Sequence, residues 1–428
     1  MKISENLLQF IWKSKILLQK KLSLTNGESI IIHQPGILNS NQGPDFLMAK
    51  ILINDIEWVG NIEIHLKSSD WNRHQHSQDQ NYNNVILHVV YENDIPLERD
   101  IPCLEMKGYI DVNLLKQYQI LMDSQTDIPC QHFISDVPRI IIQSQWDNMM
   151  AARLQSKVER LKIELSKNNF DWEALFYYKL CYYLVTPVNS DSMNELTKRV
   201  SYNLLQKQKE SLESIEAILF GTAGFLEDQS DAYALELKAR FLHLKAKHQI
   251  QEMESVNWKF LRMRPSHFPT MRIAQIATLY FNNNQILNLI LECNTVAQFY
   301  SLMQHNASQY WERHYSFGNP TKKSNKSHIG KNTLDILIIN VVAPFFYTYA
   351  EINHNNQIKS KADQWLYQIK AESNKYTKIW DKLGIHAAHS GESQAMIEQY
   401  KSLCSLHKCV DCKIGAKILT QNLLNNYN

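Results

Sequence analysis

Residues 43–67, with the sequence GPDFLMAKILINDIEWVGNIEIHLK, decide the fold of the N-terminal part of the chain. Two runs rich in Ile, Leu, Val and aromatic residues, Phe46 to Ile53 and Trp58 to Lys67, flank the polar pair Asn54-Asp55. Such runs on either side of a short polar turn are typical of adjacent strands. We therefore expect a β-hairpin here, entered through the Gly43-Pro44 turn.

The regions around this hairpin extend the pattern. Further strands are expected at Ile30 to Ile32, Val85 to Tyr91 and Ile101 to Lys107, and a short amphipathic helix at Glu5 to Trp12. From about Asp111 onward, apolar residues recur with the helical period. The sequence predicts an α+β fold, with an N-terminal mixed β-sheet domain and flanking helix over residues 1–125 and a large, mostly α-helical domain over residues 126–428.

Composition and charge exclude several classes of protein. The 428 residues include only 12 Gly and 11 Pro and are 44% hydrophobic, which excludes collagen-like and wholly disordered chains. The net charge of +2 excludes a strongly basic footprint over the whole molecule, and residues 1–110 carry 10 Lys and Arg against 13 Asp and Glu. The apolar stretch Leu334 to Ala350 is interrupted by polar residues and a proline, so we expect a core helix, no membrane span and a cytoplasmic protein.

The densest group of polar residues lies on the predicted hairpin and just after it. Glu63, His65 and Lys67 alternate along one strand and therefore project to one face. Whether Asp45 joins them depends on the register of the hairpin. A two-residue turn places Asp45 and Glu63 on opposite faces, whereas a three-residue connection or a bulge gathers all four side chains.

These residue types suit metal-dependent hydrolysis. Asp45 and Glu63 on neighbouring strands can bind Mg²⁺ or Mn²⁺ through oxygen ligands and leave positions for water and a phosphate. A nearby ammonium or imidazole would orient or deprotonate the attacking water. A zinc site formed by His65, His74 and His76 is the alternative, although their spacing matches no specific zinc signature.

The order of the polar residues resembles the PD-(D/E)-x-K nuclease superfamily. It has a Glu on the first helix (Glu5), Pro44-Asp45 at a strand start, and Glu63-Ile64-His65 on the next strand. The resemblance implies a restriction-endonuclease-like fold, metal ligation by Asp45 and Glu63, and a supporting carboxylate at Glu5. His65 stands where the superfamily has a lysine, and Lys67, two residues later on the same face, is the candidate substitute.

Two further resemblances add to this one. The segment with Trp71, His74 and His76 is similar to the His-rich tract near the active site of very-short-patch-repair-type members of the superfamily. Nearly the whole chain also resembles an uncharacterised family of bacterial proteins known only as a domain of unknown function, which implies no activity. That resemblance covers GPDF (43–46), NIEIHLKSSDW (61–71), YNNVILHVV (82–90), RPSHFPTMRIAQIA (264–277) and the C-terminal cysteines.

Three cysteines near the C-terminus, Cys404, Cys409 and Cys412, form a second group of candidate ligands. Two thiolates separated by two residues can bind one tetrahedral ion, so we weigh a structural zinc site equally with ordinary buried thiols. An iron–sulfur cluster, which some nucleases of the superfamily carry on four terminal cysteines, ranks lower because three local cysteines are one short. The fourth ligand is open, and the candidates are His407, Cys130, Cys181 and Cys293.

A basic and aromatic segment, Trp258 to Arg272, contains no acidic residue. Arginine binds phosphates and aromatic rings stack on bases, so the segment could contact nucleic acid. The alternative is that its aromatic residues are core residues and its arginines pair with acids elsewhere. The candidate nucleic-acid-binding residues are Lys259, Arg262, Arg264 and Arg272.

These features favour a divalent-metal-dependent, nuclease-like protein that hydrolyses phosphodiester bonds in DNA or RNA. Its partner would be nucleic acid, and no small-molecule cofactor is evident. The rival interpretation is a non-catalytic scaffold or nucleic-acid-binding protein whose polar cluster is structural or degenerate. His65 in the lysine position and the acidic balance of residues 1–110 favour this rival.

Overall fold

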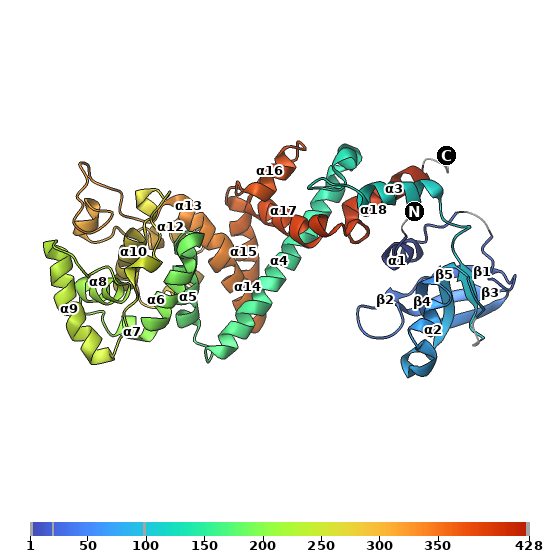
Figure 1. Ribbon diagram of the computed structural model, residues 1–428, viewed down its shortest axis with the longest axis horizontal. Coiled ribbons are helices and arrows are strands. Elements are labelled where there is room, and N and C mark those ends of the chain that lie inside the picture. The colour runs from blue at the N-terminus through green and yellow to red at the C-terminus, as the bar shows by residue number, and fades with distance from the viewer. Residues whose placement is uncertain (1–2, 19–20, 97–99, 425–428) are drawn as a thin grey trace. The chain divides into compact units, whose positions relative to one another are not determined.

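The computed structural model describes residues 3–18, 21–96 and 100–424 (Figure 1). The chain folds into two compact units: unit 1 comprises residues 1–149, 375–386 and 395–428, and unit 2 comprises residues 150–374 and 387–394. Unit 1 contains a mixed β-sheet and unit 2 is built mainly from helices, so the α+β expectation is confirmed. The expected boundary at residue 125 lies inside unit 1.

The sheet of unit 1 is antiparallel on one side and parallel on the other. Its strands are β1 (Ile30–Gln34), β2 (Ile37–Leu38), β3 (Phe46–Ile53), β4 (Ile56–Lys67), β5 (Val85–Glu92) and β6 (Cys103–Glu105). The order is β1-β3-β4-β5-β6, and the short β2 pairs with β3. Antiparallel pairing joins β1 to β3 and β3 to β4, whereas β5 pairs in parallel with both β4 and β6. The direction of pairing therefore changes at β4, which carries Glu63 and His65.

Helix α1 (Glu5–Lys13) packs against β4. Its apolar residues recur at helical spacing, and Leu7, Leu8, Ile11 and Trp12 are fully buried. Ser4 caps the helix by accepting a hydrogen bond from the N–H of Leu7. Glu5 lies in the first turn of this helix, which packs against strand β4. The other helices that lie wholly in unit 1 are α2 (Asp70–Arg73), α3 (Val112–Met122), α16 (Lys375–Asp381) and α18 (Lys413–Leu424).

The parallel pairing of β4 and β5 requires a crossover connection. Residues 68–84 provide it, with α2 followed by two 3-10 turns, His76–Gln78 and Gln80–Tyr82. The connection is fixed by Trp71, which is fully buried and packs with Tyr82 and Val85. The His-containing tract is therefore an ordered crossover that returns to the start of β5.

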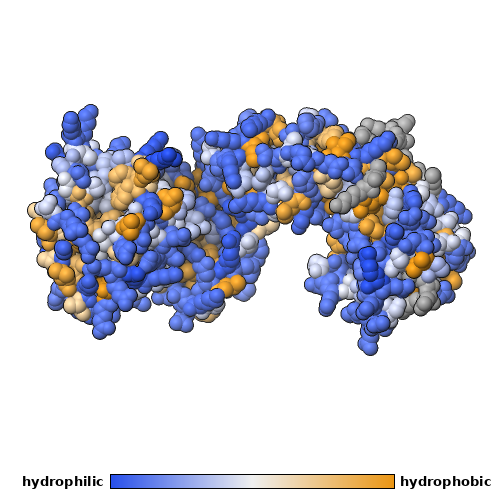
Figure 2. Space-filling view, viewed as in Figure 1, coloured by the Kyte–Doolittle hydropathy of each residue, from blue (hydrophilic) through white to orange (hydrophobic). Residues whose placement is uncertain are grey.

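Unit 2 has one large apolar core formed by its helices. They are α5 (Trp172–Leu184), α6 (Ser190–Arg199), α7 (Tyr202–Gln206), α8 (Leu212–Thr222), α9 (Ala232–His248), α10 (Pro269–Asn282), α11 (Ile286–Glu292), α12 (Val296–Met303), α13 (Lys331–Leu337), α14 (Ala343–Ile352) and α15 (Asn356–Gln368). Helices α4 (Arg139–Lys167) and α17 (Ser390–Ser402) have residues in both units. The face of the protein shown in Figure 2 is mainly polar, with apolar residues between the polar ones.

The apolar stretch Leu334 to Ala350 lies in the core of unit 2. It belongs to a longer helical segment, Lys331–Ile352, in which a π-helical turn (Ile338–Val342) joins α13 to α14. Pro344 has no N–H for the carbonyl four residues earlier, which accounts for the irregular turn before it. Among the described helices this segment is the one long and apolar enough to cross a membrane, and 72% of its most apolar window is buried inside the structure.

Candidate metal site in the N-terminal sheet

A β-bulge in β3 decides which side chains meet on the sheet. The β3–β4 hairpin has the two-residue turn Asn54-Asp55, but its register shifts by one residue between Ala49 and Phe46. Met48, in the shifted segment, has a φ of 56°, in the left-handed region. Phe46 then pairs with Ile62, so Asp45 lies opposite Glu63. The bulge thus gathers two carboxylates that a regular hairpin with this turn would place on opposite faces.

Asp45 and Glu63 are joined by hydrogen bonds across the two strands. The N–H of Asp45 donates to Oε2 of Glu63 at 3.1 Å, and the N–H of Ile64 donates to Oδ2 of Asp45 at 3.0 Å. The other oxygen of Asp45 accepts a bond from Nε2 of Gln9, on α1, at 2.9 Å. Both oxygens of Asp45 are therefore held by protein donors, and Oε1 of Glu63 is directed elsewhere.

Oε1 of Glu63 faces a group of histidines. It lies 3.3 Å from Nε2 of His65 and 3.3 Å from Nε2 of His76. Nε2 of His65 is also 3.3 Å from Nε2 of His76 and 3.2 Å from Nδ1 of His74. One ligand atom from each of the three histidines lies within 4.8 Å of the others. We call Glu63, His65, His74 and His76 the histidine cluster.

The crossover between β4 and β5 supplies two of these rings. His74 ends α2 on the exposed side of the cluster, and His76 begins the next 3-10 turn and is buried. The ring of His76 stacks on Tyr82, with centroids 3.9 Å apart, and meets the edge of Trp71. Aromatic packing therefore fixes the ring of His76 beside the strand that carries His65.

His88 is a member of the site that the sequence analysis did not identify. It is fully buried on β5, where it pairs with Glu63 in the parallel ladder. Its Nε2 is hydrogen-bonded to Nδ1 of His65 at 2.9 Å. The available indication was its position in the apolar run VILHVV (85–90), because a histidine inside a buried strand needs a polar partner.

Burial disfavours the charged form of five groups of the site and shifts the pKa of each accordingly. It raises the pKa of Glu63 to about 7, and burial together with the negative charge of Glu63 raises that of Asp45 to about 6. Burial lowers the pKa of His65, and it lowers that of His76 to about 4 and that of His88 to about 3. Near pH 7 His65, His76 and His88 are therefore neutral, with lone pairs available to an electrophile.

Glu5 and Lys67, which the sequence also predicts for this site, lie at different distances from the histidine cluster. Glu5 is close enough that its negative charge raises the pKa of Glu63 and opposes the burial effect on His65. Lys67 is 55% exposed, and its ammonium lies 3.9 Å from Asp94. The structure therefore places Glu5 beside the site and pairs Lys67 with an acid at the end of the strand.

The basic segment of unit 2 divides into exposed and buried residues. Lys259, Arg262 and Arg264 are exposed. Arg272 is 3% exposed, and its guanidinium donates to Oε1 of Gln275 at 2.8 Å and to Oγ1 of Thr333 at 3.0 Å. Arg272 is therefore a core residue, and the other three are available at the surface.

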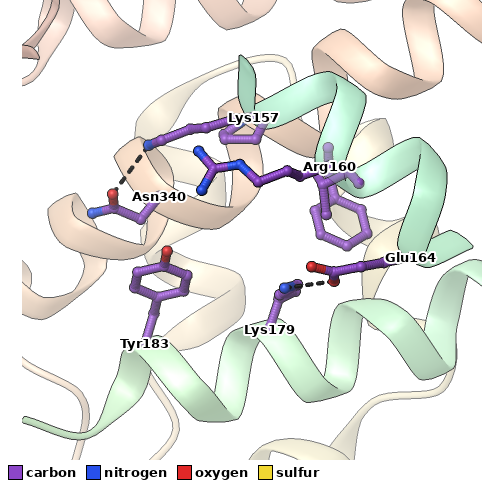
Figure 3. Close-up of a pocket in the computed structure, with 9 residues that line it drawn as sticks. Lys157, Arg160, Glu164, Lys179, Tyr183 and Asn340 are labelled. Carbon is purple, nitrogen blue, oxygen red and sulfur yellow. Dashed lines mark hydrogen bonds and ion pairs between the residues drawn. The ribbon is translucent and has the colours of Figure 1, made fainter. Parts of the chain in front are cut away.

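A pocket in unit 2 is lined by further basic side chains, shown in Figure 3. Lys157 donates to Oδ1 of Asn340 at 3.1 Å, and Lys179 pairs with Glu164 at 2.5 Å. In Figure 3, Arg160 lies between Lys157 and Lys179. The pocket has three cations and one carboxylate and therefore attracts anions. These cations come from α4 and α5 and form no run in the sequence that could have indicated the pocket.

Comparison with known proteins gives a family and no activity. A family model described as "Protein of unknown function (DUF2851)" matches residues 5–375. No curated protein and no solved structure matches the chain. The matched region contains the histidine cluster and Cys130 but ends before Cys404, Cys409 and Cys412.

Proposed function

The chain belongs to the DUF2851 family of unknown function, and we propose that its unit 1 is a divalent-metal-dependent, nuclease-like hydrolase of phosphodiester bonds. The observation that carries the proposal is the histidine cluster, in which a carboxylate and three imidazoles face one another across a strand and its crossover. Carboxylate and imidazole ligands near the end of a strand, with one side open to solvent, suit a catalytic metal ion.

The donor atoms of Glu63, His65 and His76 fit a metal ion in type and spacing, and those of His65, His74 and His76 lie within 4.8 Å of one another. A tetrahedral ion with metal–nitrogen bonds of about 2.1 Å separates its ligand atoms by about 3.4 Å. The separations of His65 from Glu63, His74 and His76 are 3.2–3.3 Å. Because these ligands are mostly nitrogen atoms, they favour Mn²⁺ or Zn²⁺ over Mg²⁺, which prefers oxygen.

The surrounding residues orient the ligands. A bound divalent ion would supply a nucleophilic hydroxide and stabilise charge on the phosphate. Asp45 holds Glu63 through its N–H, and Gln9 holds Asp45 in turn. When Nε2 of His65 acts as a ligand, its Nδ1 carries the proton and donates to His88, which fixes the ring. His74 is exposed, so water and substrate can approach from its side.

The order of elements in unit 1 supports a nuclease rather than another metal-dependent hydrolase. Helix α1 with Glu5, the antiparallel strands β3 and β4 with Asp45 and Glu63, and the parallel strand β5 follow the arrangement that the resemblance to the PD-(D/E)-x-K superfamily implies. We therefore propose a restriction-endonuclease-like fold for unit 1. Exposed cations of unit 2, Lys259, Arg262 and Arg264, would add phosphate contacts.

A cleavage assay tests the proposal. Full-length protein is incubated with Mn²⁺, Zn²⁺ or Mg²⁺ and with single-stranded, duplex and branched DNA and RNA. We expect metal-dependent cleavage that Glu63→Gln and His65→Ala reduce by at least about 100-fold, since each removes a ligand. Glu57→Gln is the matched control, because it makes the same change on β4 at a side chain that is 48% exposed and paired with Lys50. Cleavage that survives in both site variants would refute the assignment.

One observation favours the second candidate, a non-catalytic scaffold or nucleic-acid-binding protein with a structural metal. Lys67, the candidate substitute for the superfamily lysine, pairs with Asp94. In this case the protein would bind metal through His65, His74 and His76 and would bind nucleic acid, yet the assay would show no cleavage with any of the three ions.

A further inference from the structure

Four cysteines from two distant parts of the chain come together in unit 1. Cys130 precedes a 3-10 turn (Gln131–Asp136), and Cys404, Cys409 and Cys412 lie on and after two others (Cys404–Leu406 and Cys409–Asp411). Their exposed fractions are only 5–7%. None of the four takes part in a disulfide bond.

Hydrogen bonds fix the two chain segments against each other. Nε2 of His407 lies 2.9 Å from the carbonyl oxygen of Ser124, and the hydroxyl of Tyr400 donates to Asp127 at 3.4 Å. The thiols also interact electrostatically: burial raises the pKa of the Cys130 thiol, and the neighbouring Cys412 and Cys409 raise it further. Cys130 is therefore the fourth cysteine, which sequence spacing left open.

A chain of buried amides directs a hydrogen-bond donor at two of the sulfurs. The backbone N–H of Lys413 can only donate, and it bonds to Oε1 of Gln145 at 3.0 Å. The amide nitrogen of Gln145 must then donate to Oε1 of Gln399, at 2.8 Å. This orientation leaves Nε2 of Gln399 facing Sγ of Cys412 at 3.2 Å and Sγ of Cys404 at 3.7 Å.

Cys412 receives further donors from the backbone. The N–H groups of Gly415 and Ile414 lower the pKa of its thiol, although burial raises that pKa overall. Gly415 is required here, because a Cβ at this position would lie 2.1 Å from the carbonyl oxygen of Cys409. A neutral thiol is a weak acceptor, whereas a metal-bound thiolate is a strong one. These donors would stabilise a metal-bound thiolate at Cys412, and a buried thiolate needs a cationic centre.

We propose that Cys130, Cys404, Cys409 and Cys412 bind an iron–sulfur cluster of the 4Fe–4S type. The spacing of the sulfurs decides between this cluster and a zinc ion. Within the described part of the chain, ligand atoms gather in threes within 4.8 Å at the histidine cluster, and no three cysteine sulfurs form such a group. A zinc ion with Zn–S bonds of about 2.3 Å would hold its sulfurs about 3.8 Å apart. A 4Fe–4S cluster spreads its thiolates further, because each binds a different iron atom.

The iron–sulfur cluster would link Cys130 to the C-terminal segment that carries the other three cysteines, as a covalent crosslink would. Gln399 and Gln145 would act as positioning residues that orient donors to the thiolates. This proposal does not depend on the histidine cluster, which lies on other elements and has other ligands.

The test uses full-length protein purified without oxygen and reconstituted with ferrous iron and sulfide. We expect about four iron and four acid-labile sulfide per chain, with the brown absorbance and electron paramagnetic resonance signal of a reduced cluster. Cys130→Ser and Cys412→Ser should lose most of the iron. Cys293→Ser, at a half-buried cysteine of unit 2, should keep it.

A second variant guards against misfolding of the cysteine mutants. Gln399→Leu keeps all four thiols but removes the donor, so iron should leave it several-fold faster when a chelator is added. Wild-type protein that takes up neither iron nor sulfide would overturn the proposal. Zinc bound at one ion per chain, or iron retained by Cys130→Ser, would overturn it as well.

Discussion

Met48 shows how one residue changes the chemistry that a strand offers. Its φ of 56° is unusual for a residue with a side chain and marks the bulge in β3. Without the extra residue, the two-residue turn would place Asp45 opposite Ile64 and send Glu63 to the other face. With it, Asp45 meets Glu63, whose Oε1 lies 3.3 Å from Nε2 of His65 and from Nε2 of His76. Bulges are frequent beside active sites for this reason.

At the same scale, Glu216 contributes to how the stability of unit 2 depends on pH. It is fully buried on α8, where Ser308 donates to it at 2.9 Å and Tyr233 also donates. Burial raises its pKa from 4.5 to about 7. Between these values the folded protein keeps the proton and the unfolded chain releases it. The free energy of unfolding contributed by Glu216 is therefore complete below about pH 4.5 and is lost as the pH rises through about 7.

Glu216→Gln should remove this dependence, because the amide does not titrate. Between about pH 5 and about pH 8, the free energy of unfolding of the variant should therefore rise relative to that of wild type. Urea unfolding at several pH values measures it. Leu242→Ala, at an exposed side chain of α9 that does not titrate, should show a difference that does not change with pH. Parallel pH profiles for both variants would contradict the prediction.

At the scale of elements, the crossover between β4 and β5 assembles the histidine cluster. Parallel strands cannot be joined by a tight turn, so the chain must travel the length of the strand before β5 begins. Residues 68–84 cover this distance, and Trp71 and Tyr82 anchor the segment. The crossover therefore brings His74 and His76 beside β4, and the strand direction sets its position.

Metal binding should accordingly stabilise unit 1 through this crossover. At a free metal concentration of about 100 times Kd, Mn²⁺ or Zn²⁺ should raise the free energy of unfolding of wild type by about 2.7 kcal/mol, and a chelator should reverse the gain. His76→Ala should lose most of this stabilisation, because it removes a ligand from the crossover. Thermal unfolding with and without metal measures the effect.

His33→Ala provides the control for this experiment, since His33 is exposed on β1. Its metal-induced shift in Tm should equal that of wild type. An equal shift in His76→Ala would remove His76 from the ligand set.

At the scale of the whole molecule, the chain leaves unit 1 and later returns to it. Residues 375–386 and 395–424 complete unit 1, where Trp380 meets Trp146 edge to face and α18 packs against α3. The family match ends at residue 375, where this return begins. The stability of the sheet-containing unit therefore depends on residues distant from the sheet in the sequence.

Leu419→Ala tests this dependence. Leu419 is 1% exposed on α18, so its truncation should cost unit 1 about 2–5 kcal/mol. Limited proteolysis should then cleave unit 1 faster while residues 150–374 remain resistant. Leu406→Ala, at a side chain that is 57% exposed, should change stability by less than about 0.5 kcal/mol. Faster cleavage within residues 150–374 would contradict the assignment of α18 to unit 1.

Much of the local structure could be predicted from the sequence. The expected helix at Glu5 to Trp12 agrees with α1, and the expected strand at Phe46 to Ile53 agrees with β3. The helical pattern expected after Asp111 is divided into many separate helices, among them α15 and α16. The candidate site was recognisable through Glu63, His65, His74 and His76, because polar residues in strand-like runs are conspicuous. His88 was not, since a single histidine in an apolar run does not reveal its partner.

The sequence by itself determined the type and order of the elements, because hydrophobic periodicity and turn residues act within a few positions of the chain. Tertiary structure alone decided the register at Met48, the meeting of His65 with His88, and the arrival of Cys130 beside Cys404, Cys409 and Cys412. Each of these results depends on packing between segments far apart in sequence. No local pattern specifies such packing, because it is set by the burial and hydrogen bonding of the whole unit.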